Sequence, residues 1–172
     1  MTYLQALENA TRQLSPGSGE EARLEAEALL RHVLGLSRAQ LYSRFNSDLT
    51  SDQAAAFDGL VRRRLNREPV AYIRGLKEFY GLEFHVDRRV LIPRPETELL
   101  VEKAIEWIAG KAKRTRGEDA RPAVTVADVG TGSGCIAVSL AVNLPEIQVY
   151  AIDPSPQALE VASLNCHRHG VG

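Results

Sequence analysis

The sequence predicts an α/β protein in which a helical bundle is followed by a β-hairpin and by the start of an incomplete parallel sheet covered by helices. Apolar residues recur at helical spacing through residues 1–75, and the period then changes to two. Further along, apolar runs at 124–129 and 149–152 flank a glycine turn and a helical stretch. We therefore divide the chain into a helical domain (1–75), a linking hairpin (76–93) and the first part of an α/β domain (94–172).

The composition is that of an ordinary globular protein. The 172 residues are 44% hydrophobic and 25% charged, and the formal net charge of −1 does not favour a non-specific nucleic-acid surface. Apolar runs stay well short of the ~18 residues of a transmembrane helix, and Glu8 does not fit a secretory signal. Cys135 and Cys166 make no disulfide framework. We therefore expect a monomeric cytoplasmic protein that binds neither a membrane nor nucleic acid directly.

Four capping boxes mark the expected helix starts of the first domain. They are Thr2/Gln5, Ser18/Glu21, Ser37/Gln40 and Thr50/Gln53. Each precedes an apolar stripe with a polar back, which predicts a bundle core, and Gly35 is the expected terminator of the second helix. The only basic cluster, formed by residues 62–64 and Arg67, is either a solvated helix end or a contact for an acidic protein or RNA.

Alternation of apolar and polar residues predicts the hairpin. Leu82, Phe84 and Val86 alternate with polar residues, and a short polar turn separates them from a second run at residues 90–92. Pro93 ends that run because proline cannot donate to a strand ladder.

A helix is expected next, over residues 99–109. Leu100, Ala104 and Trp107 or Ile108 would face a sheet. The polar segment 111–122 reads as a loop.

The glycine turn carries the strongest functional signal. Residues 128–134 read Asp-Val-Gly-Thr-Gly-Ser-Gly, and Asp153 follows at the end of the next strand. Glycine lets a ligand approach the backbone, and an acid at the second strand tip can accept both hydroxyls of a ribose. The candidate cofactor residues are Gly130, Thr131, Gly132, Ser133, Gly134 and Asp153, with Asp128 as an acid that orients the loop.

Two other interpretations of this turn remain open. A dinucleotide site needs G-x-G-x-x-G, whereas here the third glycine comes one residue early, and Asp128 would sit poorly beside a pyrophosphate. The glycines could also serve packing alone, with Asp153 as an acid at a helix N-terminus. Cys166, His167 and His169 match no standard zinc spacing, so we predict no metal site.

Several motifs together resemble a known family. The glycine motif is similar to motif I of class I, Rossmann-like methyltransferases, which bind S-adenosylmethionine. Phe-Tyr-Gly at 79–81 and Pro-Arg-Pro-Glu-Thr-Glu at 93–98 precede it in the order seen in the release factor glutamine methyltransferases, the PrmC/HemK family. The resemblance implies methylation of the Gly-Gly-Gln glutamine side-chain nitrogen in peptide chain release factors, in translation termination. It also implies that residues 1–75 hold that protein substrate and that Arg94, Pro95, Glu96 and Thr97 line the cofactor-side cleft.

The family's acceptor motif, Asn-Pro-Pro-Tyr, does not occur in the sequence. An amide nitrogen is a poor nucleophile, so groups that orient it carry much of the catalysis. We therefore assign no catalytic residue here and expect an N-terminal portion of the enzyme with an unpaired, apolar sheet edge. Two alternatives are an adenine-N6 DNA or RNA methyltransferase, which would share a similar acceptor motif, and a non-catalytic release-factor-binding fragment.

Overall fold

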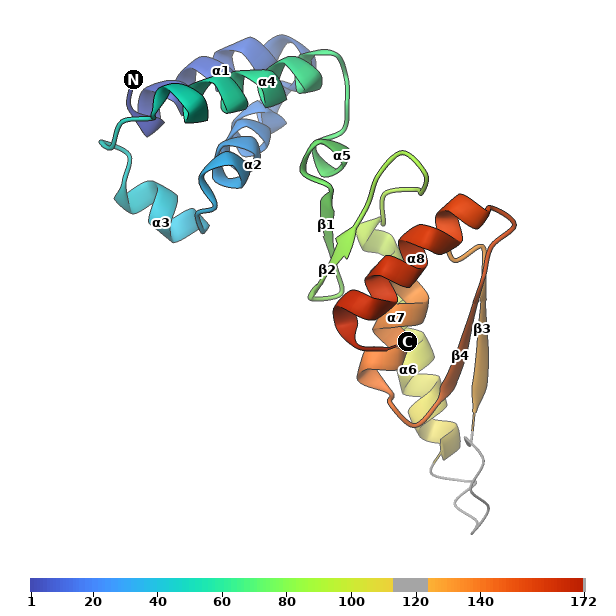
Figure 1. Cartoon of the computed structure of the whole chain (residues 1–172). Helices are drawn as coiled ribbons and strands as arrows, with labels where there is room; N and C mark the ends of the chain where they lie inside the picture. The colour runs from blue at the N-terminus through green and yellow to red at the C-terminus, as the bar shows by residue number, and fades with distance from the viewer. Residues whose placement is uncertain (113–123, 172) are drawn as a thin grey trace. The chain divides into compact units, whose positions relative to one another are not determined.

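The chain forms two compact units, which are Met1–Arg74 and Gly75–Gly172 (Figure 1). The computed structural model describes residues 1–112 and 124–171. The first unit is helical, and the second contains both β-sheets. The division therefore falls where the apolar period of the sequence changes, and the hairpin groups with the second unit.

The first unit consists of helices packed around one apolar core. The elements are α1 (Tyr3–Ser18), η1 (Gly19–Glu21), α2 (Ala22–Leu34), α3 (Arg38–Ser43), α4 (Ser51–Leu65) and α5 (Val70–Arg74). The buried core residues include Leu7, Leu14, Leu29, Leu30, Leu41, Phe57 and Val61. Gly35 ends α2 in the left-handed conformation, as predicted.

Three of the four predicted capping boxes are confirmed, at Thr2, Ser37 and Thr50. The fourth, at Ser18, is wrong because α1 continues through Pro16 and ends at Ser18. A proline this late in a helix removes one backbone donor without cutting off the helix that precedes it. The Ser18 hydroxyl instead accepts a hydrogen bond from the Arg64 guanidinium at 3.2 Å.

The arginines of the basic cluster make contacts within the first unit. The Arg64 guanidinium donates to the Glu25 carboxylate at 2.9 Å, and the Arg67 guanidinium donates to the Gly17 carbonyl at 2.9 Å. Arg63 makes two hydrogen bonds to Glu68. Three of the four arginines are therefore paired within the unit, and Arg62, Arg63 and Arg67 remain exposed at the end of α4, as the solvated-end interpretation expects.

Removing Arg64 should destabilise the first unit. We expect Arg64→Ala to lower the free energy of unfolding by about 1–3 kcal/mol, because it leaves the mostly buried Glu25 carboxylate without its charged donor. Arg62→Ala is the matched control, since this exposed arginine lies on the same helix, and a change within about 0.5 kcal/mol is expected. Denaturant titration measures both. Equal losses in the two variants would contradict the interpretation.

The second unit begins with an antiparallel hairpin. Strand β1 (Leu76–Phe79) pairs with β2 (Leu82–His85), and Phe79 lies opposite Leu82. Tyr80 and Gly81 form the two-residue turn with φ of 51° and 71°, as a type I′ turn requires. The predicted pairing of residues 82–86 with 90–92 is therefore wrong, and residues 90–92 lie in no strand. The turn is fixed by the Glu98 carboxylate, which accepts the Tyr80 N–H at 3.1 Å.

The rest of this unit is a helical layer against two parallel strands (Figure 1). It comprises η2 (Pro95–Thr97), α6 (Glu98–Ala112), β3 (Thr125–Val129), α7 (Cys135–Asn143), β4 (Gln148–Ile152) and α8 (Pro156–His169). Strand β3 pairs in parallel with β4, from Thr125 opposite Gln148 to Val129 opposite Ile152. Helix α6 contacts α7 and buries Val101 and Ile108, whereas Leu100 and Trp107, expected against a sheet, are exposed. It also includes the first two residues of the expected loop 111–122, and residues 113–122 lie outside the described part.

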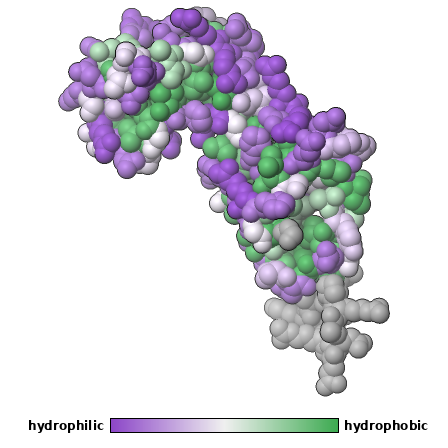
Figure 2. Space-filling view, viewed as in Figure 1, coloured by the Kyte–Doolittle hydropathy of each residue, from purple (hydrophilic) through white to green (hydrophobic). Residues whose placement is uncertain are grey.

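One face of the parallel pair is exposed in the part of the chain that the structure describes. Side chains alternate along each strand, so every second one points away from α7 and α8. On that outer face Val129 is 77%, Tyr150 56% and Ile152 48% exposed. Among the described residues, β3 and β4 are the only strands of this parallel sheet, so the outer edge of each strand is unpaired. Figure 2 shows apolar side chains at the surface of this unit among polar ones.

None of the helices in residues 1–112 and 124–171 combines the length and the apolar character that crossing a membrane requires.

Candidate functional site

The glycine loop joins the end of β3 to the start of α7. Gly130, Gly132 and Gly134 have φ of 82°, 54° and 78°, a region that other residues rarely adopt. The N–H groups of Gly130 and Thr131 donate to the Ile152 carbonyl at 2.7 and 3.0 Å. The loop is therefore tied to the end of β4, where Asp153 follows.

Asp128 organises the loop from within. Its Oδ2 accepts the Thr131 hydroxyl at 2.7 Å and the Ala137 N–H, in the first turn of α7, at 3.2 Å. The loop thus carries its own carboxylate at a helix N-terminus, where free N–H groups would otherwise attract an anion. The buried Thr131 hydroxyl is already committed to Asp128.

Asp153 lies against the same loop from the end of β4. Its Oδ2 accepts the Gly132 N–H at 2.9 Å, and its Oδ1 accepts the Ser155 N–H at 2.9 Å. These two backbone donors lower the pKa of Asp153, so the carboxylate is ionised at neutral pH. A carboxylate has about four acceptor positions, so Asp153 can still accept hydrogen bonds from a ligand.

Asp153 also has the structural role that the alternative interpretation predicted. Its Oδ1 holds the chain at the start of α8, and the Ser155 hydroxyl then caps that helix by accepting the Ala158 N–H. The two roles use different oxygens of one carboxylate. Asp153 therefore supports the start of α8 and contacts the glycine loop at the same time.

The three glycines of the loop serve different purposes. A Cβ on Gly130 or Gly132 would find nothing within 4 Å, so the space beside these two residues is open to a ligand. A Cβ on Gly134 would lie 3.2 Å from the Ala162 Cβ and 3.3 Å from its Cα. Gly134 is therefore needed for the close packing of the loop on α8.

The candidate cleft residues lie before α6. Arg94 is extended, Pro95 opens η2, and the Thr97 N–H donates to the Arg94 carbonyl at 3.0 Å. Arg94, Pro95 and Glu96 are exposed and Thr97 is half-buried. In the described ranges, no hydrogen bond or ion pair joins these four residues to the glycine loop. Their place in a cofactor cleft stays a prediction.

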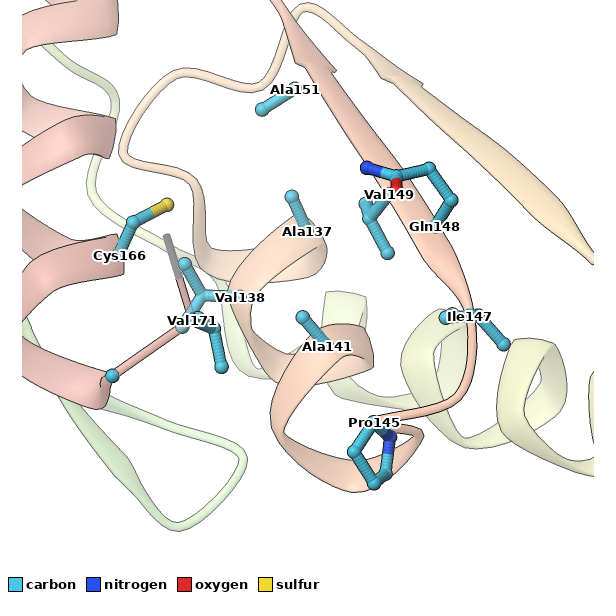
Figure 3. Close-up of a pocket in the computed structure, with 11 residues that line it drawn as sticks. Ala137, Val138, Ala141, Pro145, Ile147, Gln148, Val149, Ala151, Cys166 and Val171 are labelled. Atoms are coloured by element: carbon cyan, nitrogen blue, oxygen red, sulfur yellow. The ribbon is translucent and has the colours of Figure 1, made fainter. Parts of the chain in front are cut away.

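A separate pocket of about 370 Å³ lies between α7, β4 and the end of α8. Figure 3 shows Ala137 and Ala141 from α7, Val149 from β4 and Cys166 from α8 around it. Neither the glycine loop nor Asp153 lines it. This pocket is therefore distinct from the candidate cofactor site.

The two histidines at the end of α8 have hydrogen-bond partners within the second unit. The His169 ring bonds the Glu83 carbonyl at 3.0 Å and contacts the Phe84 ring, and His167 bonds the Ser163 carbonyl at 2.7 Å. Within the described residues no three His, Cys, Asp or Glu side chains are grouped so that they could hold a metal ion.

Sequence reasoning missed Asn165. This fully buried side chain contacts both the backbone of His85 and the carbonyl of Ser133 in the glycine loop. The available signal was its spacing, because Asn165 continues the apolar stripe of Ala158, Val161 and Ala162 along α8. A polar residue on a buried stripe must be paired, which marks it as significant.

Comparison with known proteins identifies both units. The family model for the PrmC N-terminal domain matches residues 5–75, and that for the methyltransferase small domain matches residues 118–172. The release factor glutamine methyltransferase of Chlorobaculum tepidum is 51% identical over 88% of this chain and 50% of its own length. The proteins of that name from Geobacter sulfurreducens and Koribacter versatilis are 47% and 43% identical over 88% and 98% of this chain.

The chain spans about half the length of the curated relatives it matches, with 49% of the Geobacter protein and 56% of the Koribacter protein covered. The matched models agree with the two units described above, a helical one and one with the glycine loop. The chain therefore belongs to the release factor glutamine methyltransferase family.

Proposed function

We propose that this chain supplies the S-adenosylmethionine site of a methyltransferase that modifies the glutamine side-chain nitrogen of the Gly-Gly-Gln loop in release factors. The observation that carries the proposal is the pair of carboxylates around the glycine loop. Asp128 bonds the loop and the start of α7, and Asp153 bonds Gly132. The loop residues 130–134 would approach the cofactor, and Asp153 would accept its ribose hydroxyls.

The charge of this loop favours S-adenosylmethionine over a dinucleotide. A pyrophosphate at the N-terminus of α7 would meet the Asp128 carboxylate, which already accepts the Ala137 N–H. S-adenosylmethionine carries a sulfonium cation and an ammonium group, and nearby carboxylates attract both. This arrangement supports a methyl donor and argues against a hydride carrier.

The substrate side of the proposal rests on the first unit. Residues 5–75 match the PrmC N-terminal domain, and we assign them to docking of the release factor. Because Arg63, Arg64 and Arg67 bond Glu68, Glu25 and Gly17 internally, docking would use other side chains. We further propose that the segment 76–93, which contains the hairpin, links the two domains and that the protein works as a monomer in the cytoplasm.

The decisive experiment measures S-adenosylmethionine binding to Asp153→Ala by calorimetry in the full-length protein. We expect about a tenfold or greater loss of affinity, the scale of losing hydrogen bonds to a charged group. Asp58→Ala is the matched control, because it removes one negative charge from an exposed site in the first unit. Equal affinity in Asp153→Ala and wild type would refute the ribose assignment.

A methyl-transfer assay separates the remaining possibilities. Transfer to a release factor, with none to DNA or RNA, is expected from the family assignment. Transfer to adenine would instead support the nucleic-acid alternative, and binding of a release factor without turnover would support a docking fragment.

A further inference from the structure

Asn165 connects two segments that lie far from it in the sequence. Its side chain is 0% exposed and sits among Ala158, Val161 and Ala162 on the buried face of α8. The Oδ1 atom accepts the His85 N–H at 2.7 Å, and Nδ2 donates to the His85 carbonyl at 3.0 Å. One amide thus pairs with both backbone groups of the last residue of β2.

The second N–H of Nδ2 donates a hydrogen bond to the glycine loop. Nδ2 donates to the Ser133 carbonyl at 2.8 Å. The orientation of the amide is fixed by this set, since Nδ2 faces two carbonyls and Oδ1 faces an N–H group. Ser133 lies between Gly132, which is held by Asp153, and Gly134, which packs on Ala162.

Strand β2 has other anchors on α8 that do not reach the loop. His169 bonds the Glu83 carbonyl and contacts the Phe84 ring, and Arg168 pairs with the Glu83 carboxylate. Among the described residues, Asn165 is the one side chain that bonds both the hairpin and the loop. Losing it would therefore release the Ser133 carbonyl of the loop, while the other bonds of the loop and much of the hairpin docking remained.

We propose that Asn165 is a positioning residue for the cofactor site, which sets the Ser133–Gly134 peptide by tying it to the end of β2 through α8. The identity of the ligand rests on the proposed function, whereas the bonds of Asn165 to the loop and to β2 are independent of it. Asn165 makes the hairpin a structural part of the cofactor site. Asn165 acts through the backbone of the loop and is not assigned a contact with the cofactor.

Asn165→Asp tests this with minimal change of shape, because it keeps the acceptor for His85 and removes both donors. His169→Phe is the control, since it loses the bond to Glu83, retains a ring beside Phe84 and does not touch the loop. Both are made in the full-length protein and studied below their melting temperatures. We expect S-adenosylmethionine affinity to fall about tenfold in Asn165→Asp and less than about twofold in His169→Phe.

Amide hydrogen exchange of residues 130–136 without ligand is the second measurement. Exchange should accelerate in Asn165→Asp and not in His169→Phe. If Asn165→Asp does not fold, Asn165→Ser replaces it, since a hydroxyl can restore one of the two donated bonds and an intermediate loss is expected. Wild-type affinity and wild-type loop exchange in a folded Asn165 variant would overturn the proposal. If the wild-type protein binds no S-adenosylmethionine, the proposed function fails, and the loop exchange still decides the role of Asn165.

Discussion

Gly134→Ala should cost more stability than any other single methyl group added to the glycine loop. Gly134 has a φ of 78°, and the new Cβ would meet the Cα of Ala162 at 3.3 Å, a backbone atom that cannot rotate away. The left-handed conformation and the collision together should lower the free energy of unfolding by about 2–5 kcal/mol. Chemical denaturation of the full-length protein measures the loss.

Two further variants separate strain from collision. Gly170→Ala adds a methyl group at a φ of 68° with nothing within 4 Å, so it should cost only the conformational term of about 1–2 kcal/mol. Ala162→Gly removes the Cβ at 3.2 Å, leaves the Cα at 3.3 Å and itself weakens α8, so the test is a double-mutant cycle in which Gly134→Ala should cost less in the Ala162→Gly background than in the wild-type protein. A coupling energy of zero in this cycle would mean that the contact with the Ala162 side chain does not contribute to the need for glycine at this position.

Asp128→Ala is expected to have the second largest effect. It removes the acceptor of the Thr131 hydroxyl and of the Ala137 N–H, and it leaves a buried hydroxyl and a helix N-terminus without their partner. We expect a loss of about 2–4 kcal/mol in the free energy of unfolding. Because the same carboxylate shapes the loop, S-adenosylmethionine affinity should also fall.

Thr131→Val provides the comparison for Asp128→Ala. Valine keeps the volume of threonine and removes only the hydroxyl bond, so Asp128 retains the Ala137 N–H. A loss of about 1 kcal/mol is expected. Should Thr131→Val prove as damaging as Asp128→Ala, the helix N-terminus would not be the main site of action of Asp128.

Local signals predicted much of the fold. The capping boxes at Thr2, Ser37 and Thr50 and the terminator at Gly35 depend on neighbours within one helical turn, which a sequence displays directly. The order of strand, glycine turn and helix around residues 124–153 is local in the same sense. The structure brings the predicted Gly132 and Asp153 into hydrogen-bond contact.

The errors came from competing or distant interactions. Residues 82–86 alternate regularly, yet the pairing was decided by Tyr80 and Gly81, whose turn is supported by Glu98 from another element. The buried side of α6 is Val101 and Ile108 because that helix packs on α7, which its own periodicity does not specify. Asn165 was missed because its partners, His85 and Ser133, lie 80 and 32 residues away.

The separation between Asn165 and His85 has a consequence for folding during synthesis. Contacts of the first unit close within its 74 residues, so it can fold while the rest of the chain is still being made. The Ser133 carbonyl of the glycine loop cannot gain its bond to Asn165 before residue 165 has left the ribosome, although residues 130–134 emerge earlier. We therefore expect nascent chains that stop before residue 165 to protect the helical unit from proteolysis and to leave the glycine loop accessible.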